Sequence, residues 1–386
     1  MMVILFWICI AIVLYSYIGY GVFLYTLVKI NKLTSNTTNF DDTFLPNVTL
    51  VVPCFNEAEY IEEKLLNSIE LDYPKDKIEF IFISDGSNDD THDRIKKHPQ
   101  IIALHEAQRN GKAAAMNRAM SFVKSPIVIF CDANTQLNKE CVRELVKHYI
   151  NPKVGAVTGE KRIIQTDKES ASTAGEGIYW KYESFLKQLD SDFYTIVGAA
   201  GELMSYRTEL YSELPKDTLL DDLTQSMQIA LKGYRVIYEK NAYAAETASA
   251  NVGEELKRKI RIAAGAWQSM SRLGKAFNPF YNFKLSFLFI SHRVSRWTLA
   301  PLSLLLLIVF NTILYNNGII YILLFYAQCM FYVAALIGWY FENKKIKIKA
   351  FFVPYYFFIM NLCMYLGLAR YLKGKQSVSW ERSKRA

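Results

Sequence analysis

The feature that most restricts how this chain can fold is its N-terminal segment, residues 2–28, which contains no charged side chain. About 20 apolar residues are enough to cross the hydrocarbon core of a bilayer. The segment is longer and more aromatic than a secretory signal, and no small-residue cleavage site follows it. We therefore expect residues 1–30 to be a retained transmembrane anchor.

A second apolar block fills the C-terminal part of the chain, with apolar runs at 298–315, 319–341 and 350–369. The first two predict a transmembrane hairpin. The third contains Pro354 and Asn361, and it is either a further span or a re-entrant or interfacial segment. Residues 287–297 alternate aromatic and basic side chains just before the first run, which predicts an interfacial helix. We assign residues 280–372 to these helices.

The positive charge of the chain follows its apolar segments. The formal net charge is +8, and the Lys and Arg residues gather beside the apolar runs, including a basic tail at 373–386. This is the positive-inside pattern, which predicts a multi-pass protein of the cell (inner) membrane with its middle region in the cytoplasm. A full crossing at 350–369 would place the basic tail outside, against this pattern. The charge needs no nucleic acid partner.

The six cysteines are scattered, without a CxxC pair and without histidines at ligand spacing. This distribution favours reduced thiols in a cytosolic domain and argues against a zinc site.

Between the apolar blocks, residues 45–275 have the composition of a soluble α/β domain. Buried strand patterns followed by helical patterns occur four times in succession, at 47–69, 77–95, 99–123 and 125–150. Such units predict a parallel sheet covered by helices on both faces, with ligands bound at the carboxyl ends of the strands. Polar residues stand at these ends: Asn56, Glu57, Asp85 to Asn88, Asp132 and Asn134.

Two common phosphate-binding motifs are missing from this domain. The first strand is followed by PCFNEAEY instead of the GxGxxG of dinucleotide-binding enzymes, and no GxxxxGK[ST] occurs. Nicotinamide-dependent and P-loop chemistry are therefore unsupported. A site with carboxylates and no glycine-rich cradle would need a cation to hold a diphosphate.

Seven fragments, in this order, resemble the motifs of one enzyme family. They are VVPCFNE (51–57), SDGSNDDT (84–91), RNGKAAAMN (109–117), CDAN (131–134), GAAGELMSYR (198–207), LLDDLTQSM (219–227) and RKIRIAAGAWQ (258–268). The chain resembles the family 2 glycosyltransferases, and within them the membrane-anchored members similar to hyaluronan, cellulose and poly-N-acetylglucosamine synthases. The resemblance implies an α/β GT-A domain, a Rossmann-like nucleotide-diphospho-sugar transferase fold, flanked by transmembrane helices.

The same resemblance implies a function and its partners. It predicts an inverting transfer from a UDP-sugar to the hydroxyl of a saccharide or lipid-linked acceptor, in extracellular or capsular polysaccharide synthesis beside membrane lipids. The cofactor would be Mg²⁺ or Mn²⁺, because hard divalent cations take oxygen ligands.

Individual roles also follow from the matching positions. The predicted base is Asp222, preceded by Asp221. Nucleotide-sugar contacts are predicted for Pro53, Glu57, Asp85, Lys112, Asp132, Arg258 and Arg261. The acceptor side would include Gly201, Glu202 and Trp267, with Arg207 as a further candidate, and the metal ligands would be Asp132 and Asn134. Asn134 departs from the family's second aspartate, and the spacing to Trp267 departs from the Gln-x-x-Arg-Trp motif.

Plainer interpretations of these residues stay open. Asp85 and Asp221 are good helix caps, and Glu57 suits the first turn of a helix. Lys112 is either an exposed lysine or a cation that compensates an anionic ligand at a helix start. Asn134 can simply shape a turn. The two arginines can equally contact lipid headgroups.

Three other functions compete with a transfer to a hydroxyl. One is transfer to a polyprenyl phosphate, and another is a non-catalytic membrane subunit that binds a nucleotide sugar. An export channel would leave the soluble domain unexplained. We also consider that residues 374–385 fold back over the mouth of the site.

Overall fold

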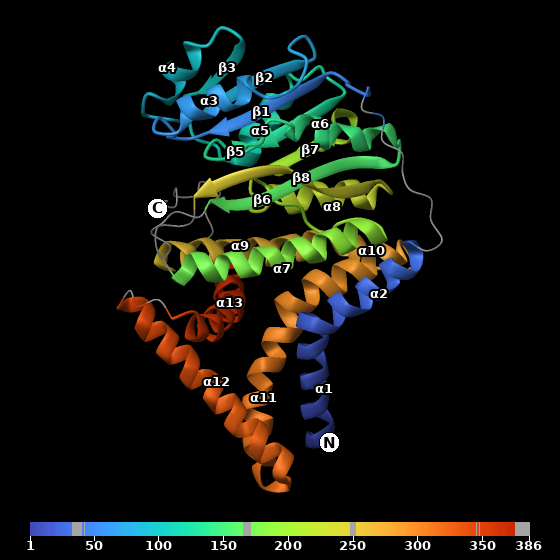
Figure 1. Cartoon of the computed structure of the whole chain (residues 1–386), viewed down its shortest axis with the longest axis vertical. Coiled ribbons are helices and arrows are strands. Elements are labelled where there is room, and N and C mark those ends of the chain that lie inside the picture. The colour runs from blue at the N-terminus through green and yellow to red at the C-terminus, as the bar shows by residue number, and fades with distance from the viewer. Residues whose placement is uncertain are drawn as a thin grey trace.

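The computed structural model describes residues 1–32, 41, 43–164, 171–247, 252–344, 346 and 348–374. In Figure 1 a twisted sheet with its helices forms the upper part of the molecule, a layer made of α7 and α9 lies beneath it, and the apolar helices extend below. Residues 375–386 of the basic tail, with the predicted return to the site, lie outside the described residues.

The first half of the domain confirms the predicted parallel units. Strands β1 to β4 pair in parallel in the order β3-β2-β1-β4. Their bounds are β1 Val48–Cys54, β2 Ile78–Asp85, β3 Ile101–Glu106 and β4 Ile127–Cys131. The helices that follow them are α3 Ile61–Ile69, α4 Thr91–Lys96, α5 Lys112–Met120 and α6 Cys141–Val146.

The second half of the sheet is mixed, which the four strand-and-helix units did not predict. Strand β7 (Leu203–Arg207) runs antiparallel to β4, and Cys131 lies opposite Leu203. The carboxyl end of β4 therefore meets the amino end of β7. The remaining strands are β6 Val154–Ile164, β8 Arg235–Thr247 and the short β5 Gln136–Leu137, and the order continues β7-β6-β8-β5.

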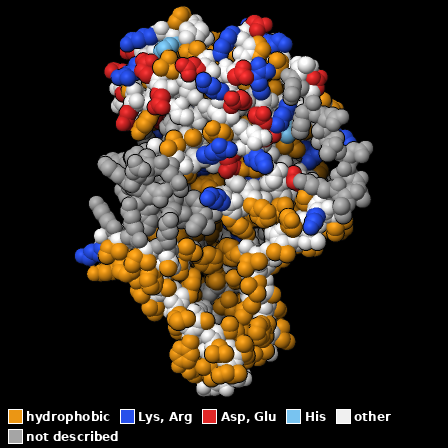
Figure 2. Space-filling model, in the orientation of Figure 1, with side chains coloured by type: hydrophobic (Ala, Val, Ile, Leu, Met, Phe, Trp, Pro, Cys, Tyr) orange, Lys and Arg blue, Asp and Glu red, His pale blue; other side chains and the backbone are white. Residues whose placement is uncertain are grey.

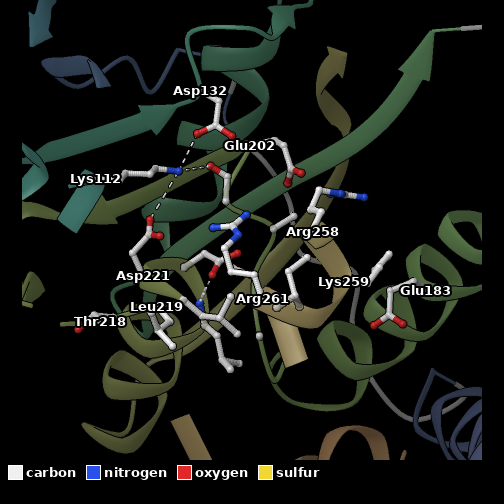
Figure 3. A pocket seen from close by; sticks show the side chains of 18 of the residues that line it. Lys112, Asp132, Glu183, Glu202, Thr218, Leu219, Asp221, Arg258, Lys259 and Arg261 are labelled. Carbon is white, nitrogen blue, oxygen red and sulfur yellow. Dashed lines mark hydrogen bonds and ion pairs between the residues drawn. The ribbon is translucent and has the colours of Figure 1, made fainter. Parts of the chain in front are cut away.

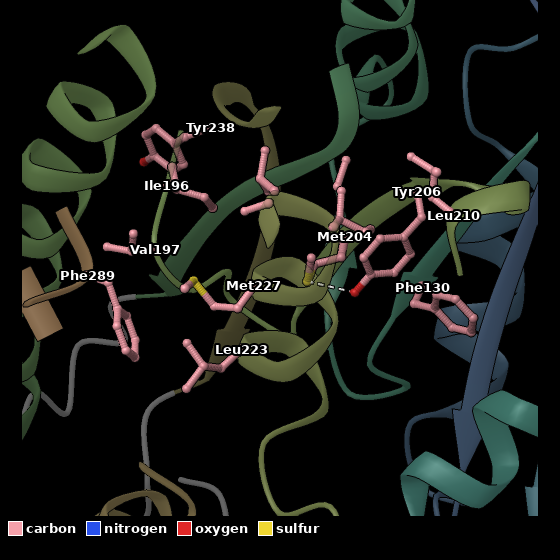
Figure 4. Packing of buried hydrophobic residues seen from close by; sticks show 14 of the residues in the cluster. Phe130, Ile196, Val197, Met204, Tyr206, Leu210, Leu223, Met227, Tyr238 and Phe289 are labelled. Carbon is pink, nitrogen blue, oxygen red and sulfur yellow. Dashed lines mark hydrogen bonds between the residues drawn. The ribbon is translucent and has the colours of Figure 1, made fainter. Parts of the chain in front are cut away.

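Three further helices complete the domain: α7 Ala171–Phe193, α8 Asp221–Leu231 and α9 Val252–Arg272. The hydrophobic core beneath β7 contains Tyr206 and Met204 of the sheet and Leu223 and Met227 of α8. Phe289 packs into the same core from the segment that leads to the membrane helices (Figure 4). The domain and the apolar helices thus share one core, which fixes their relative position.

Within the described residues, four helices are long and apolar enough to cross a membrane: Met2–Asn31, Phe283–Asn317, Ile319–Asn343 and Ala350–Leu372. Figure 2 shows the apolar side chains gathered on this lower part and the charged ones on the upper part. The corresponding elements are α1 Met2–Leu14 and α2 Tyr20–Lys32 with a π-helical turn between them, α10 Phe283–Leu288, a π-helical segment Phe289–Leu299, α11 Ala300–Leu314, α12 Ile319–Asn343 and α13 Lys349–Leu372.

Two predicted membrane segments have an unexpected environment. Residues 287–297 continue directly into α11, and their His292 is fully buried against the domain. Helix α13 packs along α9 beneath the domain (Figure 1), where the Trp267 indole N–H donates to the Met364 carbonyl at 3.1 Å. Contact with a domain helix over the second half of α13 favours the interfacial alternative over a full crossing.

Candidate active site

Two connected cavities lie at the carboxyl ends of the parallel strands. The strand-end cavity is lined by residues of the turns after β1, β2 and β4, including Pro53, Glu57, Asp85 and Asp132. The central cavity, of about 260 Å³, reaches from there to α7, α8 and α9. Four residues line both cavities: Glu57, Lys112, Asp132 and Asn134. Most of the predicted site residues therefore meet in one continuous space.

Asp85 links two turns of the strand-end cavity. Its Oδ2 accepts hydrogen bonds from the backbone N–H groups of Asn110 and Gly111, at 3.0 and 2.7 Å. The side chain is 4% exposed and lies at the end of β2, before the turn that leads to α4. It therefore fastens the segment that begins α5 and does not cap α4, so the capping interpretation is wrong.

The turn after β1 is held by a left-handed residue. Asn56 has a φ of 52°, and its Oδ1 accepts from the Asn88 backbone N–H at 3.0 Å. The next residue, Glu57, donates its N–H to Thr91 Oγ1, and its carbonyl accepts from the Ile61 N–H at the start of α3. Glu57 thus precedes the helix instead of lying in its first turn, and its side chain faces both cavities.

Lys112 joins two carboxylates that are distant in the sequence. Its Nζ donates to Asp132 Oδ1 at 2.6 Å and lies 3.6 Å from Asp221 Oδ2 (Figure 3). Burial lowers the pKa of Lys112, but the two carboxylates outweigh it and raise the pKa above its ordinary value. The exposed-lysine interpretation is wrong, and neighbouring carboxylates compensate the cation at the helix start.

Asp222 has the properties of a base that works near neutral pH. Burial and the adjacent Asp221 raise the pKa of its carboxyl to about 7, and the Leu223 N–H donates to its Oδ1 at 2.7 Å. A Cβ added at Gly201 would lie only 3.2 Å from Asp222 Oδ2. The missing side chain of Gly201 thus lets the loop before β7 approach this carboxylate.

Glu202 is ionised and forms an ion pair with Lys161, a residue that no motif indicated. The Lys161 Nζ donates to its Oε1 at 2.6 Å and also pairs with Glu246. Burial raises the pKa of Glu202, but Lys161 outweighs it and lowers the pKa to about 2. Lys161 lies in β6, where a single lysine in a strand carries no recognisable sequence signal.

Two arginines of α9 bring positive charge to the central cavity. Arg258 and Arg261 lie one turn apart and both line it, as their spacing predicts. The Arg258 Nε donates to Glu255 at 2.9 Å, and the side chain is 9% exposed. Burial and the charge of Arg258 lower the pKa of Arg261 to about 10, while Asp221 and Asp222 oppose this. These positions do not agree with contact to lipid headgroups.

Two predicted residues do not reach the cavities. Trp267 packs against α13, because it lies six positions after Arg261 and therefore on another face of the helix. Arg207, at the far end of β7, donates to the carbonyls of Val154, Tyr149 and Asn151 and has a structural role. Neither residue is among the described residues that line the two cavities.

The opposite end of the central cavity consists of residues that the motifs did not indicate. They come from α7 and from the segment that leads to α11: Tyr179, Trp180, Glu183, Lys187, Arg293 and Trp297. The α7 members recur at helical spacing on one face, which is a signal that the sequence contained. Arg293 and Trp297, in the segment that leads to α11, have the sequence pattern of side chains at a membrane surface.

Oxygen ligands for a cation are few. Among the residues that the structure describes, no group of three or more His, Cys, Asp or Glu could hold a metal. Asp132 and Asn134 offer one carboxylate and one amide oxygen beside both cavities. Mg²⁺ is usually held by one or two carboxylates plus substrate phosphates. The donor set therefore fits a cation that binds together with a phosphate ligand.

Comparison with known proteins agrees with this geometry. Residues 49–214 match the family described as glycosyl transferase family 2. The chain is 28% identical over 239 residues to a poly-β-1,6-N-acetyl-D-glucosamine synthase of Staphylococcus aureus (strain COL), covering 59% of this chain and 56% of the relative. The Staphylococcus epidermidis synthase is 25% identical over 236 residues, with 58% and 56% covered. The chain thus spans about half the length of the curated relatives it matches.

A solved structure extends the likeness to the whole chain. It is a mannosyltransferase from Pyrobaculum calidifontis in complex with GDP-Man and Mn²⁺, 23% identical, with a TM-score of 0.71. The superposition covers 96% of this chain and all of that one. Together with the family match, this confirms the predicted GT-A fold.

Proposed function

Since residues 49–214 match the family described as glycosyl transferase family 2, we propose that this protein transfers a sugar from a UDP-sugar to an acceptor hydroxyl at the cytoplasmic face of the cell membrane. The observation that carries this proposal is the placement of Asp222, a half-buried carboxyl whose pKa is raised to about 7, in the cavity that also contains Lys112 and Arg261. The central cavity thus contains both a candidate base and a cationic site for the leaving diphosphate.

The reaction is a single displacement with inversion. Asp222 accepts the proton of the acceptor hydroxyl as its oxygen bonds to the anomeric carbon. The bond between that carbon and the diphosphate breaks, and the electron pair leaves with the nucleotide. Arg258, Arg261 and Lys112 stabilise the developing negative charge, with Arg258 and Arg261 suited to phosphate oxygens by their fork geometry.

A divalent cation completes the donor site. Asp132 and Asn134 would hold Mg²⁺ or Mn²⁺, and the cation supplies further neutralisation of the diphosphate. Asp85, Glu57 and Pro53 line the strand-end cavity and are placed to contact the nucleotide.

The names of the relatives suggest which sugar to test first. They are poly-β-1,6-N-acetyl-D-glucosamine synthases, so UDP-N-acetylglucosamine is our first donor and polysaccharide assembly our proposed role. The test incubates the purified full chain in membranes with a panel of UDP-sugars and GDP-mannose, and it measures nucleotide release and product length. Absence of release from every donor would support the rival interpretation, a non-catalytic subunit.

The pH dependence should follow the Asp222 carboxyl. Its pKa is raised to about 7, so the ionised form that accepts a proton is lost as the pH falls through 7. We expect kcat/KM to fall about tenfold per pH unit below that point, because kcat/KM reports the ionisation of the free enzyme. A profile of initial rates between pH 5 and 9 measures it. A flat profile down to pH 5 would argue against this base.

Removal of the metal should stop the reaction, and Asn134 should set its affinity. EDTA is expected to abolish release of the nucleotide. Asn134→Asp adds a negative charge to the site and should tighten metal binding about tenfold, equivalent to about 1.4 kcal/mol, and Asn134→Ala should weaken it. Metal titrations of initial rate measure both, with Asn241→Asp, an exposed substitution on β8, as the control. Equal metal affinities in all variants would show that Asn134 only shapes its turn.

A further inference from the structure

A third cavity lies where the domain meets α13 and the segment before α11. Building on the proposed function, we propose that this junction cavity holds the hydrocarbon chain of a lipid-linked acceptor, and that the phosphate of this lipid lies against Lys259, Arg293 and Arg296. The acceptor would then be a saccharide on a lipid phosphate, instead of a free saccharide or a bare lipid phosphate.

The junction cavity is continuous with the central cavity. Five residues line both: Tyr179, Lys259, Ile262, Arg293 and Trp297. A single molecule can therefore extend from the Asp222 carboxylate, past the aromatic side chains of α7, into the space beneath α9.

The charged side chains that line the junction cavity are all cations, and their carboxylate partners, Glu183 and Glu255, lie outside the lining. The described lining of the junction cavity contains Lys259, Arg293 and Arg296 and no carboxylate. Arg293 and Arg296 are held by Glu183, with their NH1 groups 2.5 and 3.1 Å from its oxygens. Preorganised guanidinium groups at the edge of an apolar space suit a phosphate.

The rest of the cavity is apolar and narrow. Its α13 side consists of Val353, Phe357, Met360 and Met364, and its volume is about 280 Å³. A cavity of roughly 150 Å³ can hold one benzene molecule, so this space suits part of one hydrocarbon chain and is too small for the two chains of a bilayer phospholipid. Val353 is 50% exposed on the apolar lower part of the molecule, where the chain could continue into the bilayer.

The position of the base decides which group of such a lipid reacts. Lys259, Arg293 and Arg296 line the junction cavity, whereas Asp132 and Asp221 line the central cavity and not the junction. A phosphate nucleophile would have to leave these cations and approach carboxylates, and it would not need a base. A sugar attached to the phosphate can place its hydroxyl at Asp222 while the phosphate stays beside the cations. Tyr179 and Trp180 line the cavity and offer flat apolar surfaces to this sugar.

Binding tests this inference directly. The full chain in phosphatidylcholine nanodiscs is offered undecaprenyl phosphate or undecaprenol, and retained lipid is measured by mass spectrometry. We expect about tenfold preference for the phosphate, lost in Lys259→Gln but kept in Lys257→Gln, which changes an exposed lysine of the same helix. Met360→Trp should reduce retention of both lipids about tenfold, whereas Leu362→Trp, on the exposed side of α13, should not.

Donor hydrolysis separates this inference from the proposed function. Release of UDP from UDP-N-acetylglucosamine with water as acceptor needs no lipid, and it also shows that each variant is folded. If the protein hydrolyses the donor but retains both lipids equally, or if Met360→Trp has no effect, the cavity assignment is wrong and the proposed function stands. Elongation of a free oligosaccharide without retention of the lipid phosphate would also overturn the assignment. Retention of the lipid phosphate without hydrolysis of the donor would support the cavity assignment and contradict the proposed enzymatic function.

Discussion

Asp222→Asn is expected to lower kcat for sugar transfer to a hydroxyl by about 10²–10⁴-fold, the range that a general base contributes. The amide keeps the size of the side chain and can still accept the Leu223 N–H on its oxygen. It has no basicity, so the attacking hydroxyl loses the proton acceptor that we assign to it. Initial rates with radiolabelled donor measure the loss. The KM for the donor should change little because we propose the strand-end cavity, which Asp222 does not line, as the nucleotide site.

The matched control is Asp217→Asn, which changes an exposed carboxylate in the loop before α8. Its rate should stay within about twofold of the unchanged protein, as for most surface substitutions. If Asp222→Asn retains nearly full activity, the acceptor is a phosphate that needs no base. That result would support transfer to a polyprenyl phosphate and contradict the mechanism proposed here.

The sequence predicted the part of the site that depends on local pattern. Each parallel strand ends in polar residues, and the sheet brings these ends to one edge. Asp85 and Asp132 were therefore predictable at the same edge, at the ends of the two strands that flank β1. The order of the motifs added Asp222. The contact of Lys112 with both Asp132 and Asp221 was not predictable, because it depends on how α5 and α8 pack against the antiparallel half of the sheet.

Charges beside an apolar segment are ambiguous in the sequence. Arg293 and Arg296 have the spacing of membrane-surface residues, and a helix shows the same pattern whether it faces lipid headgroups or a protein. The structure turns both toward Glu183 of α7. The predicted acceptor-side role of Trp267 is not supported, for a related reason. The packing of α9 on α13 determines which face of α9 lines the cavity, and Trp267 lies on the face against α13.

This junction gives the largest expected effect on stability. Glu183 is 2% exposed and accepts from His292, Arg293 and Arg296, and this ionic contact lowers its pKa well below the ordinary value against the effect of burial. We expect Glu183→Gln to lower the free energy of unfolding by about 3–5 kcal/mol, because it leaves buried cations without their carboxylate. Thermal unfolding in detergent should show a midpoint about 10 °C lower.

The kcat should also fall when the ionic contact of Glu183 is lost. The Arg293 guanidinium also donates to the carbonyls of Val197 and Gly198, in the loop that carries Gly201 toward Asp222. A rotated Arg293 releases that loop, so kcat should fall even at temperatures where Glu183→Gln is folded. Asp192→Asn, near the end of the same helix, where the Gln188 side chain donates to the carboxylate at 2.8 Å, should change the unfolding free energy by about 0.5 kcal/mol or less. If Glu183→Gln unfolds at the same temperature as this control, the ionic contact does not join the domain to the membrane helices. A loss of stability with unchanged kcat would instead limit its role to folding, because the loop would then hold its position without Arg293.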